Sequence, residues 1–435
     1  MTRTLVRDLS SHIDSRITVF GWVDTARLQR TMQFVLIRDH TGVVQVTNRR
    51  TDPASDIETA LENVSTESAV KITGVVRENP VVKLGGIELI PDSVEIVSSA
   101  EAPLPINDQS GVEVRLDWRF LDVRSPRNQL IFRVQTTVES AIRQFVQSRG
   151  GTEMHTPKLM GTSSESGSDV FNVQYFHRLA YLAQSPQFFK QMAISAGIDI
   201  VFEIGPVFRA EPSFTSRHAT EFTGIDIEIA WIGDVNDVMS FEEQMLAHVL
   251  AQVEAEHGNE IRELFGVEVV VPKLPFPRLT MREVRQRLAA AGWAPENDKG
   301  DIDSAGERLI SSLVEQEFGH EFVFVTEYPV NVRPFYHMRP ESDPTVTSSF
   351  DLIWKGIEIT TGAQREHRYN VLVQQAKEKG MALEPMHSYL DSFRYGTPPH
   401  GGLGAGLGRI LMVMLGLDNI REATFLFRGP HRLEP

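Results

Sequence analysis

The first hundred residues alternate hydrophobic and polar positions in short segments, a pattern that is typical of β-strands. Five such segments are rich in β-branched residues and are separated by turn-forming residues. They cover residues 16–23, 32–38, 42–47, 69–77 and 86–97. Five short strands in so short a stretch suit a partly open barrel of the oligonucleotide-binding (OB) type, although another small β-fold fits the pattern about as well.

The alternation stops at residues 101–128, where three prolines surround a charged stretch. We interpret this segment as a hinge between two domains. The sequence therefore predicts an OB-type domain over residues 1–100 and a second, larger domain over residues 129–435.

The second domain begins with a helical pattern, because hydrophobic residues recur at helical spacing from Leu130 to Phe145. Gly150 and Gly151 end this helix, and an extended segment follows up to Pro157. A long helix followed by an extended segment could form a dimer interface, or it could be an ordinary helix packed on its own sheet.

Further along the chain, strands are expected over residues 201–209 and 222–230, with two more strands in the last 80 residues. These strands are joined by hairpins and long loops without regular alternation of strand and helix. The pattern therefore favours an α+β fold, in which helices pack on an antiparallel sheet.

Composition excludes several classes of protein. No apolar run approaches the ~18 residues of a membrane span, and the N-terminus shows no signal-peptide pattern, so no membrane association is expected. The chain has no cysteine, which rules out disulfides and thiolate metal sites and makes the cytoplasm the expected location. Any bound metal must have oxygen or imidazole ligands.

The net charge of −15 argues against bulk binding of nucleic acid, but the first 50 residues carry eight arginines against four aspartates. Phe34 and Gln45 lie on the second and third predicted strands, near Arg27 and Arg30. An aromatic ring, an amide and two cations on one face could bind single-stranded RNA. Alternatively, Phe34 belongs to the core and the arginines are simply solvated.

Candidate chemistry appears first around Arg209 and Glu211, which stand two residues apart on a predicted strand and therefore share a face. A guanidinium there could bind a phosphate, and the carboxylate could accept a hydrogen bond from an exocyclic amine. Arg217 and His218 in the following loop add two potential cations. Taken alone, such an arginine and glutamate are more often an ordinary surface ion pair.

Two further clusters follow. Asp351, Glu358 and Thr361 offer the hard oxygen ligands that Mg²⁺ takes when it also bridges phosphates, although such acids often merely face solvent. The glycine-rich segment 401–408 precedes Arg409 and an apolar run. We interpret it as a turn that presents backbone amides and an arginine to an anion at the start of a helix.

In this order, these features resemble those of the class II aminoacyl-tRNA synthetases, specifically the archaeal-type aspartyl-tRNA synthetases. The resemblance extends over essentially the whole chain. Beyond the barrel, it rests on the first class motif ending at Pro157, and on the segments 184–190, 208–222, 351–365 and 401–435.

This resemblance implies an anticodon-binding barrel, a catalytic antiparallel sheet and a homodimer. It also implies that L-aspartate reacts with ATP to form an aspartyl-adenylate, from which tRNA takes the aspartyl group, with Mg²⁺ as the cofactor. The catalytic residues would be Arg209, Glu358 and Arg409. The roles implied for the ATP site are Arg209 at the α-phosphate, Glu211 at the adenine amine, Phe222 under the adenine, Arg217, His218 and Arg409 at the distal phosphates, Gly406 and Gly408 along the nucleotide, and Asp351, Glu358 and Thr361 around Mg²⁺.

The family resemblance also assigns the amino-acid site. Lys190 and Arg365 match the ligands of the substrate's side-chain carboxylate, and asparagine offered to these cations would leave buried charge without a counter-ion. Gln187, Asp226, Arg209 and Thr361 would surround the aspartate, with Glu165 opposite its ammonium group, and the loop 163–169 could close over it.

The chain departs from the family pattern at three places. Gly408 stands where a glutamate usually precedes the arginine, which raises the question of what braces Arg409. Thr361 replaces the more usual serine. The segments 24–30 and 83–85 are unusual, and they are where such enzymes are expected to read the third anticodon base.

Because Asp24 repels phosphate and Leu84 offers no polar readout, we expect an enzyme that charges both the aspartate and the asparagine tRNA. The misacylated product would then need a tRNA amidotransferase as a functional partner. Two other interpretations stay open at this point, namely an adenylating paralogue that does not serve translation and an inactive tRNA-binding relative.

Overall fold

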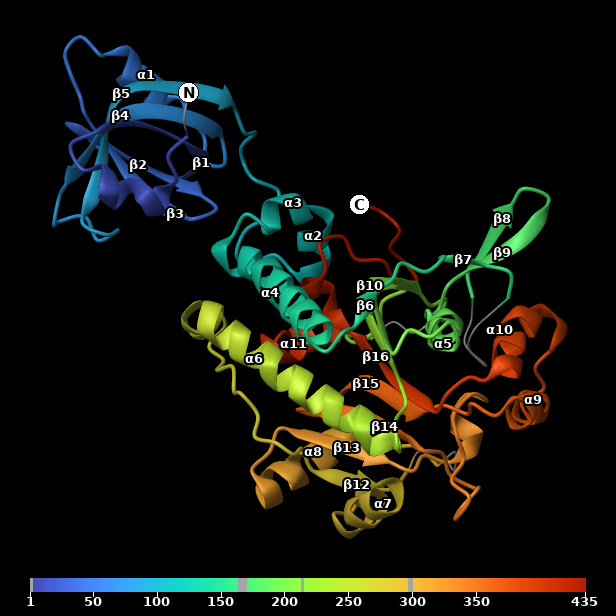
Figure 1. The fold of residues 1–435 in the computed structure, drawn as a ribbon. Coiled ribbons are helices and arrows are strands. Elements are labelled where there is room, and N and C mark those ends of the chain that lie inside the picture. The colour runs from blue at the N-terminus through green and yellow to red at the C-terminus, as the bar shows by residue number, and fades with distance from the viewer. Residues whose placement is uncertain (1–2, 163–169, 213–214, 296–299) are drawn as a thin grey trace. The chain divides into compact units, whose positions relative to one another are not determined.

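A computed structural model describes residues 3–162, 170–212, 215–295 and 300–435 of the chain (Figure 1). The chain divides into two compact units, Met1–Gly111 and Val112–Pro435. Among the described residues, no helix has the length and apolar character needed to cross a membrane.

The first unit is a closed five-stranded barrel with the strand order β1-β2-β3-β5-β4, which confirms the predicted OB-type fold. Hydrophobic residues at alternate positions point inward and fill it, among them Val35, Val46 and Ile72. Its elements are η1 (Val6–His12), β1 (Arg16–Leu28), β2 (Met32–Asp39), β3 (Gly42–Arg49), α1 (Asp56–Glu62), β4 (Ala69–Glu78) and β5 (Ile87–Ser98).

The expected hinge over residues 101–128 differs from the structure in its second half. Short helices α2 (Val112–Asp117) and α3 (Arg119–Asp122) occupy it and belong to the second unit. The Arg119 side chain is buried, pairs with Asp122 and donates to the backbone carbonyl of Glu422 at 2.7 Å. The charged stretch that suggested a hinge is therefore held within the second unit, because its Arg119 is buried in an ion pair and a backbone hydrogen bond.

The second unit is built on an eight-stranded sheet with the order β12-β13-β14-β15-β16-β11-β10-β6. Its central pairings are antiparallel, as the sequence predicts, and parallel pairs occur only at the two edges. A smaller sheet has the order β7-β9-β8. The strands are β6 (Thr152–Glu153), β7 (Leu159–Met160), β8 (Asn172–Tyr175), β9 (Arg178–Leu182), β10 (Ile200–Phe208), β11 (Glu221–Ala230), β12 (Arg278–Thr280), β13 (Phe322–Thr326), β14 (Ser349–Trp354), β15 (Ile357–Gln364) and β16 (His400–Gly406).

Helices α4, α6 and α11 cover one face of this sheet (Figure 1). The predicted helix after residue 128 is α4, which starts at Pro126 with Ser125 as its N-cap, as proline and serine favour. The helices are α4 (Pro126–Ser148), α5 (Gln187–Ser195), α6 (Val235–Phe265), α7 (Met281–Ala290), α8 (Ser304–Phe318), α9 (Tyr369–Glu378), α10 (His387–Ser392) and α11 (Leu407–Met414), with short 3-10 turns η2 (Val330–Val332), η3 (Glu384–Met386), η4 (Phe393–Tyr395) and η5 (Ile420–Ala423).

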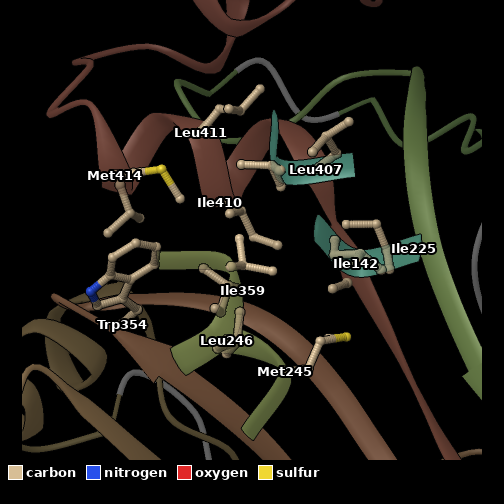
Figure 2. Packing of buried hydrophobic residues seen from close by; sticks show 14 of the residues in the cluster. Ile142, Ile225, Met245, Leu246, Trp354, Ile359, Leu407, Ile410, Leu411 and Met414 are labelled. Carbon is tan, nitrogen blue, oxygen red and sulfur yellow. The ribbon is translucent and has the colours of Figure 1, made fainter. Parts of the chain in front are cut away.

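The main core lies between these helices and the sheet. Figure 2 shows the α11 side chains Leu407, Ile410 and Leu411 in a cluster that also holds Leu246 of α6 and Ile359 of β15. The positions of the α11 residues follow helical spacing, so one side of this short helix is wholly apolar. This packing holds the strands of the eight-stranded sheet in place, and the opposite face of the sheet carries the candidate site.

Candidate active site

A cavity of about 410 Å³ opens in the second unit, within the size range of small-molecule sites. It brings together residues that are far apart in the sequence. The sequence-predicted residues that line it are Gln187, Lys190, Arg209, Glu211, Arg217, His218, Phe222, Asp226, Glu358, Thr361, Arg365, Gly406, Gly408 and Arg409. Glu165 and the loop 163–169 lie outside the described residues.

Arg209 and Glu211 lie just beyond the end of β10, not on the strand itself as the sequence analysis expects. The pairing continues for one more residue, because the Arg209 amide donates to the Thr220 carbonyl at 2.9 Å. The Arg209 guanidinium lies 5.5 Å from the ring centroid of Phe222, in a cation–π contact. The cavity thus has a cation, a carboxylate and an aromatic face close together.

The glycine-rich segment is not a turn, which corrects the sequence-based interpretation. Residues 400–406 form β16, a central strand between β11 and β15, and only Leu407 begins the helix. A Cβ on Gly402 would collide with the Ile227 carbonyl and the Glu228 carboxylate. Glycine is therefore needed here for close packing between strands and to leave room for a buried carboxylate.

Arg409 is braced by β15. Its Nη1 donates to the Glu358 carbonyl at 2.9 Å, and the Glu358 carboxylate is 3.7 Å away. The position of Gly408 adjoins Ile420, which a Cβ would approach to within 3.2 Å. Glu358 thus holds Arg409 without a glutamate at position 408.

The pKa of His218 is lowered, mainly by burial and secondarily by the positive charge of Arg409. His218 is therefore a neutral imidazole at pH 7, although the sequence suggested a cation. Its neighbour Arg217 makes an ion pair at 2.7 Å with Glu307, a residue of α8 that the sequence analysis does not identify.

The opposite part of the cavity holds a buried cluster of two cations and two anions. The Lys190 ammonium lies 3.0 Å from Asp226 and 3.3 Å from Glu228, and the Arg365 guanidinium donates to Glu228 at 2.9 Å. Burial alone would raise the pKa of Glu228, but Arg365 and Lys190 outweigh it and hold that pKa below its ordinary value. Glu228 is thus an ionised carboxylate shared by both cations.

His337 completes the surroundings of Arg365, whose Nη1 lies 3.1 Å from the His337 Nε2. Burial, followed by the charge of Arg365, lowers the pKa of His337 well below its ordinary value, so the neutral ring accepts this hydrogen bond. Neither Glu228 nor His337 was predicted from the sequence. Alternation along β11 could have suggested that Glu228 lies on the same inward face of the strand as Asp226. By contrast, no sequence pattern near His337 indicates that it contacts Arg365.

The acids Glu358 and Asp351 lie on the neighbouring strands β15 and β14. On a regular strand, residues three positions apart, such as Glu358 and Thr361, would face opposite sides of the sheet. A bulge at Ile359 turns both of them to the cavity side. Asp351 is the cross-strand neighbour of Thr361, but it is buried and pairs with Arg333 at 2.6 Å. Among the described residues, no group of three or more His, Cys, Asp or Glu side chains is arranged to hold a metal.

In the barrel, the register places Arg27 beside Phe34, and Gln45 beside Leu36, across β1, β2 and β3. Phe34 is only half-buried, so it belongs to the outer face and not to the core. Gln45 donates to Thr47 at 3.1 Å, while Arg30 lies in the exposed turn between β1 and β2. Nearby, Asp24 is engaged by Arg38 at 2.6 Å.

Comparison with known proteins identifies the class to which this fold and cavity belong. The class II tRNA synthetases (D, K and N) match residues 111–428, and the OB-fold nucleic acid binding domain matches residues 17–97. The chain belongs to the class II tRNA synthetases.

Several individual members of this class are similar to this chain. The chain is 40% identical to an aspartate–tRNA(Asp/Asn) ligase of Aeropyrum pernix over 99% of this chain and 98% of that protein. It is 39% identical to an aspartate–tRNA(Asp) ligase of Pyrococcus abyssi over 98% and 100%. The asparaginyl-tRNA synthetase of Pyrococcus horikoshii complexed with asparaginyl-adenylate has a TM-score of 0.92 at 30% identity, with full coverage of both chains.

Proposed function

We propose that this chain attaches L-aspartate to tRNA through an aspartyl-adenylate made from ATP. The observation that carries the choice of aspartate is the buried pair of cations, Lys190 and Arg365, at one end of the cavity. Asp226 and Glu228 already pair with these cations. A substrate carboxylate would add charge-assisted hydrogen bonds to them, whereas the amide of asparagine brings no negative charge. The match over the whole chain, barrel included, favours tRNA charging over an adenylating paralogue or an inactive relative.

The proposed chemistry needs no protein nucleophile. The α-carboxylate of aspartate attacks the α-phosphorus of ATP and displaces pyrophosphate, and the terminal ribose hydroxyl of tRNA then attacks the adenylate and displaces AMP. Both steps depend mainly on alignment and charge stabilisation. We assign Arg209 to the α-phosphate, Glu211 to the adenine amine and Phe222 to its ring, with Arg217, His218 and Arg409 near the distal phosphates.

On the amino-acid side, Lys190 and Arg365 would bind the side-chain carboxylate. Asp226 and Gln187 line the same end of the cavity and offer oxygens to the substrate ammonium. Lys190 has four acceptors within 3.4 Å, so its position is set before the substrate arrives. Such preorganisation favours discrimination between two nearly isosteric substrates.

The residues present also fit Mg²⁺. Asp351 Oδ1 is buried without a hydrogen-bond partner among the described residues, and burial, followed by the charge of Asp351, raises the pKa of Glu358. Two carboxylates repelling each other in a buried site are stabilised by a divalent cation. Glu358, Thr361 and Asp351 would hold the ion, and ATP oxygens would complete its shell, as is usual for Mg²⁺. Bound there, Mg²⁺ would neutralise phosphate charge.

The barrel is proposed to bind the anticodon through Phe34, Gln45, Arg27 and Arg30. Asp24 lies within β1, not in a loop, and its carboxylate is engaged by Arg38. An aspartate held in this way is not available to read the third anticodon base, which supports the proposal that both the aspartate and the asparagine tRNA are charged. If so, a tRNA amidotransferase would process the second product. The absence of cysteine supports a cytoplasmic location.

We also propose a homodimer. Exposed large hydrophobic residues gather on and near α2 and α3, where Trp118 and Phe120 are 41% and 56% exposed and their rings lie 6.0 Å apart. An exposed aromatic cluster of this kind favours a protein interface.

The experiment that tests the function is aspartylation of the two purified tRNA transcripts at one fixed salt concentration. We expect aspartyl-tRNA from both, with efficiencies within about a hundredfold of each other, roughly 2.7 kcal/mol. A larger preference for the aspartate tRNA would refute the relaxed scope, and no aspartylation of either would refute the proposed function.

A further inference from the structure

The ion pair between Arg217 and Glu307 connects two parts of the second unit that are distant in sequence. Arg217 lies between β10 and β11, whereas Glu307 is in the first turn of α8. Their side chains meet at 2.7 Å and are only 16% and 14% exposed. The contact is thus shielded from water, where an ion pair restricts a side chain more than it does on an open surface.

Helix α8 gives Glu307 a rigid base. Its N-cap Asp303 accepts hydrogen bonds from the amides of Ala305 and Gly306, at 3.0 and 2.7 Å. One turn after Glu307, the Ser311 hydroxyl accepts from the Gly356 amide at 2.9 Å. Gly356 is in the turn that joins β14 to β15, so α8 is tied to the hairpin that carries Glu358.

The two partners differ in their relation to the cavity. Arg217 lines it, but Glu307 is not among the lining residues. Glu307 therefore contacts the guanidinium from behind, and the only described hydrogen bond of that guanidinium goes from its Nη1 to Glu307. Without this carboxylate, no other described side chain would fix the direction of the arginine.

Keeping a carboxylate at position 307 is unfavourable in itself. Burial, followed by the charge of Glu358, raises the pKa of Glu307 to about 7. A buried acid that persists beside another acid, with Arg217 as its ion-pair partner, is typical of functional sites.

We propose that Glu307 is a positioning residue for the nucleotide: from its place on α8 it holds the Arg217 guanidinium at the cavity wall, where that cation binds the triphosphate of ATP. This inference rests on the proposed function, because it takes ATP as the ligand of the cavity. An arginine that is already ordered loses less conformational freedom when it binds a phosphate. Glu307 therefore acts on ATP through Arg217 and does not touch the amino acid.

The test is ATP–pyrophosphate exchange by the full-length protein, with ATP and aspartate varied separately. We expect Glu307→Ala to raise the KM for ATP by about tenfold, roughly 1.4 kcal/mol, and to leave the KM for aspartate within about twofold. Glu307→Gln retains a hydrogen-bond acceptor and should have a smaller effect. Glu315→Gln, at an exposed position on the same helix, is the matched control and should match the wild type.

A double-mutant cycle separates positioning from a general effect on folding. Once Arg217→Ala is present, adding Glu307→Ala should not raise the KM for ATP further. An equal rise in both backgrounds would overturn the proposal, as would an unchanged or lowered KM in Glu307→Ala alone. Absence of exchange in the wild type, or an Arg217→Ala variant with normal ATP kinetics, would instead refute the proposed function or the role it assigns to Arg217.

Discussion

Replacing Glu228 by glutamine tests the buried charge cluster directly. Glu228 is fully buried and lies 2.9 Å from Arg365 and 3.3 Å from Lys190. The substitution keeps the shape of the side chain but leaves two buried cations with Asp226 as the only remaining anion of the cluster. Removing one partner of a buried ion pair costs about 3–5 kcal/mol, because the remaining charge stays desolvated.

This loss should appear as a lower melting temperature of the second unit. At about 2 °C per kcal/mol for a large domain, the expected decrease is roughly 6–10 °C. Differential scanning calorimetry of the full-length protein measures it, and Glu263→Gln, on the exposed side of α6, is a matched control. A decrease below about 2 °C, or one equal to that of the control, would show that Glu228 does not balance the two cations.

The remaining predictions concern a buried proton, the acidic pair and the barrel. Glu242 is buried in α6 with a pKa raised to about 8, mainly by burial, so the folded state keeps a proton that the unfolded state releases above its ordinary pKa of 4.5. Stability should therefore fall as the pH rises from about 4.5 to 8, by at most about 4–5 kcal/mol. Glu242→Gln should flatten this dependence in denaturant titrations, and a wild-type slope in that variant would contradict the assignment. Glu358→Gln should lower pyrophosphate exchange by at least a hundredfold while tRNA binding in a filter assay stays unchanged, since neutralising Glu358 affects only the phosphate side; near-normal exchange would make the acid merely structural. Phe34→Ala should weaken both tRNAs alike by about 1–3 kcal/mol of lost stacking, and unchanged binding would place the anticodon elsewhere.

Local patterns in the sequence predict much of the fold. The alternation in the first hundred residues predicts the barrel because each strand has one face in a small core. The helical spacing from Leu130 to Phe145 likewise predicts α4, although the helix begins earlier, at Pro126, inside the segment assigned to the hinge. The stretch at Arg119 was wrongly assigned to a hinge, because its charge is neutralised by Asp122 and backbone carbonyls that only the tertiary structure supplies. The glycines of β16 suggested a turn, because the close approach of β11 and β15 is not visible in the sequence.

The residues of the site were predictable where the family resemblance assigns them. They were less predictable where contacts with residues distant in sequence determine which side chains reach the cavity. No spacing rule places Glu358 and Thr361 on one face, since that depends on the bulge at Ile359. Glu307 becomes relevant only because α8 packs behind the cavity, and His337 only because it contacts Arg365. Such residues act through pairings across long sequence separations, which single-chain patterns do not encode.

The central claim is that the cavity selects aspartate through Lys190 and Arg365. The most direct measurement is ATP–pyrophosphate exchange by the wild-type protein with aspartate or asparagine as the only amino acid. We expect exchange with aspartate to be at least about a hundredfold more efficient than with asparagine, a difference of roughly 2.7 kcal/mol. Equal exchange with asparagine would contradict it.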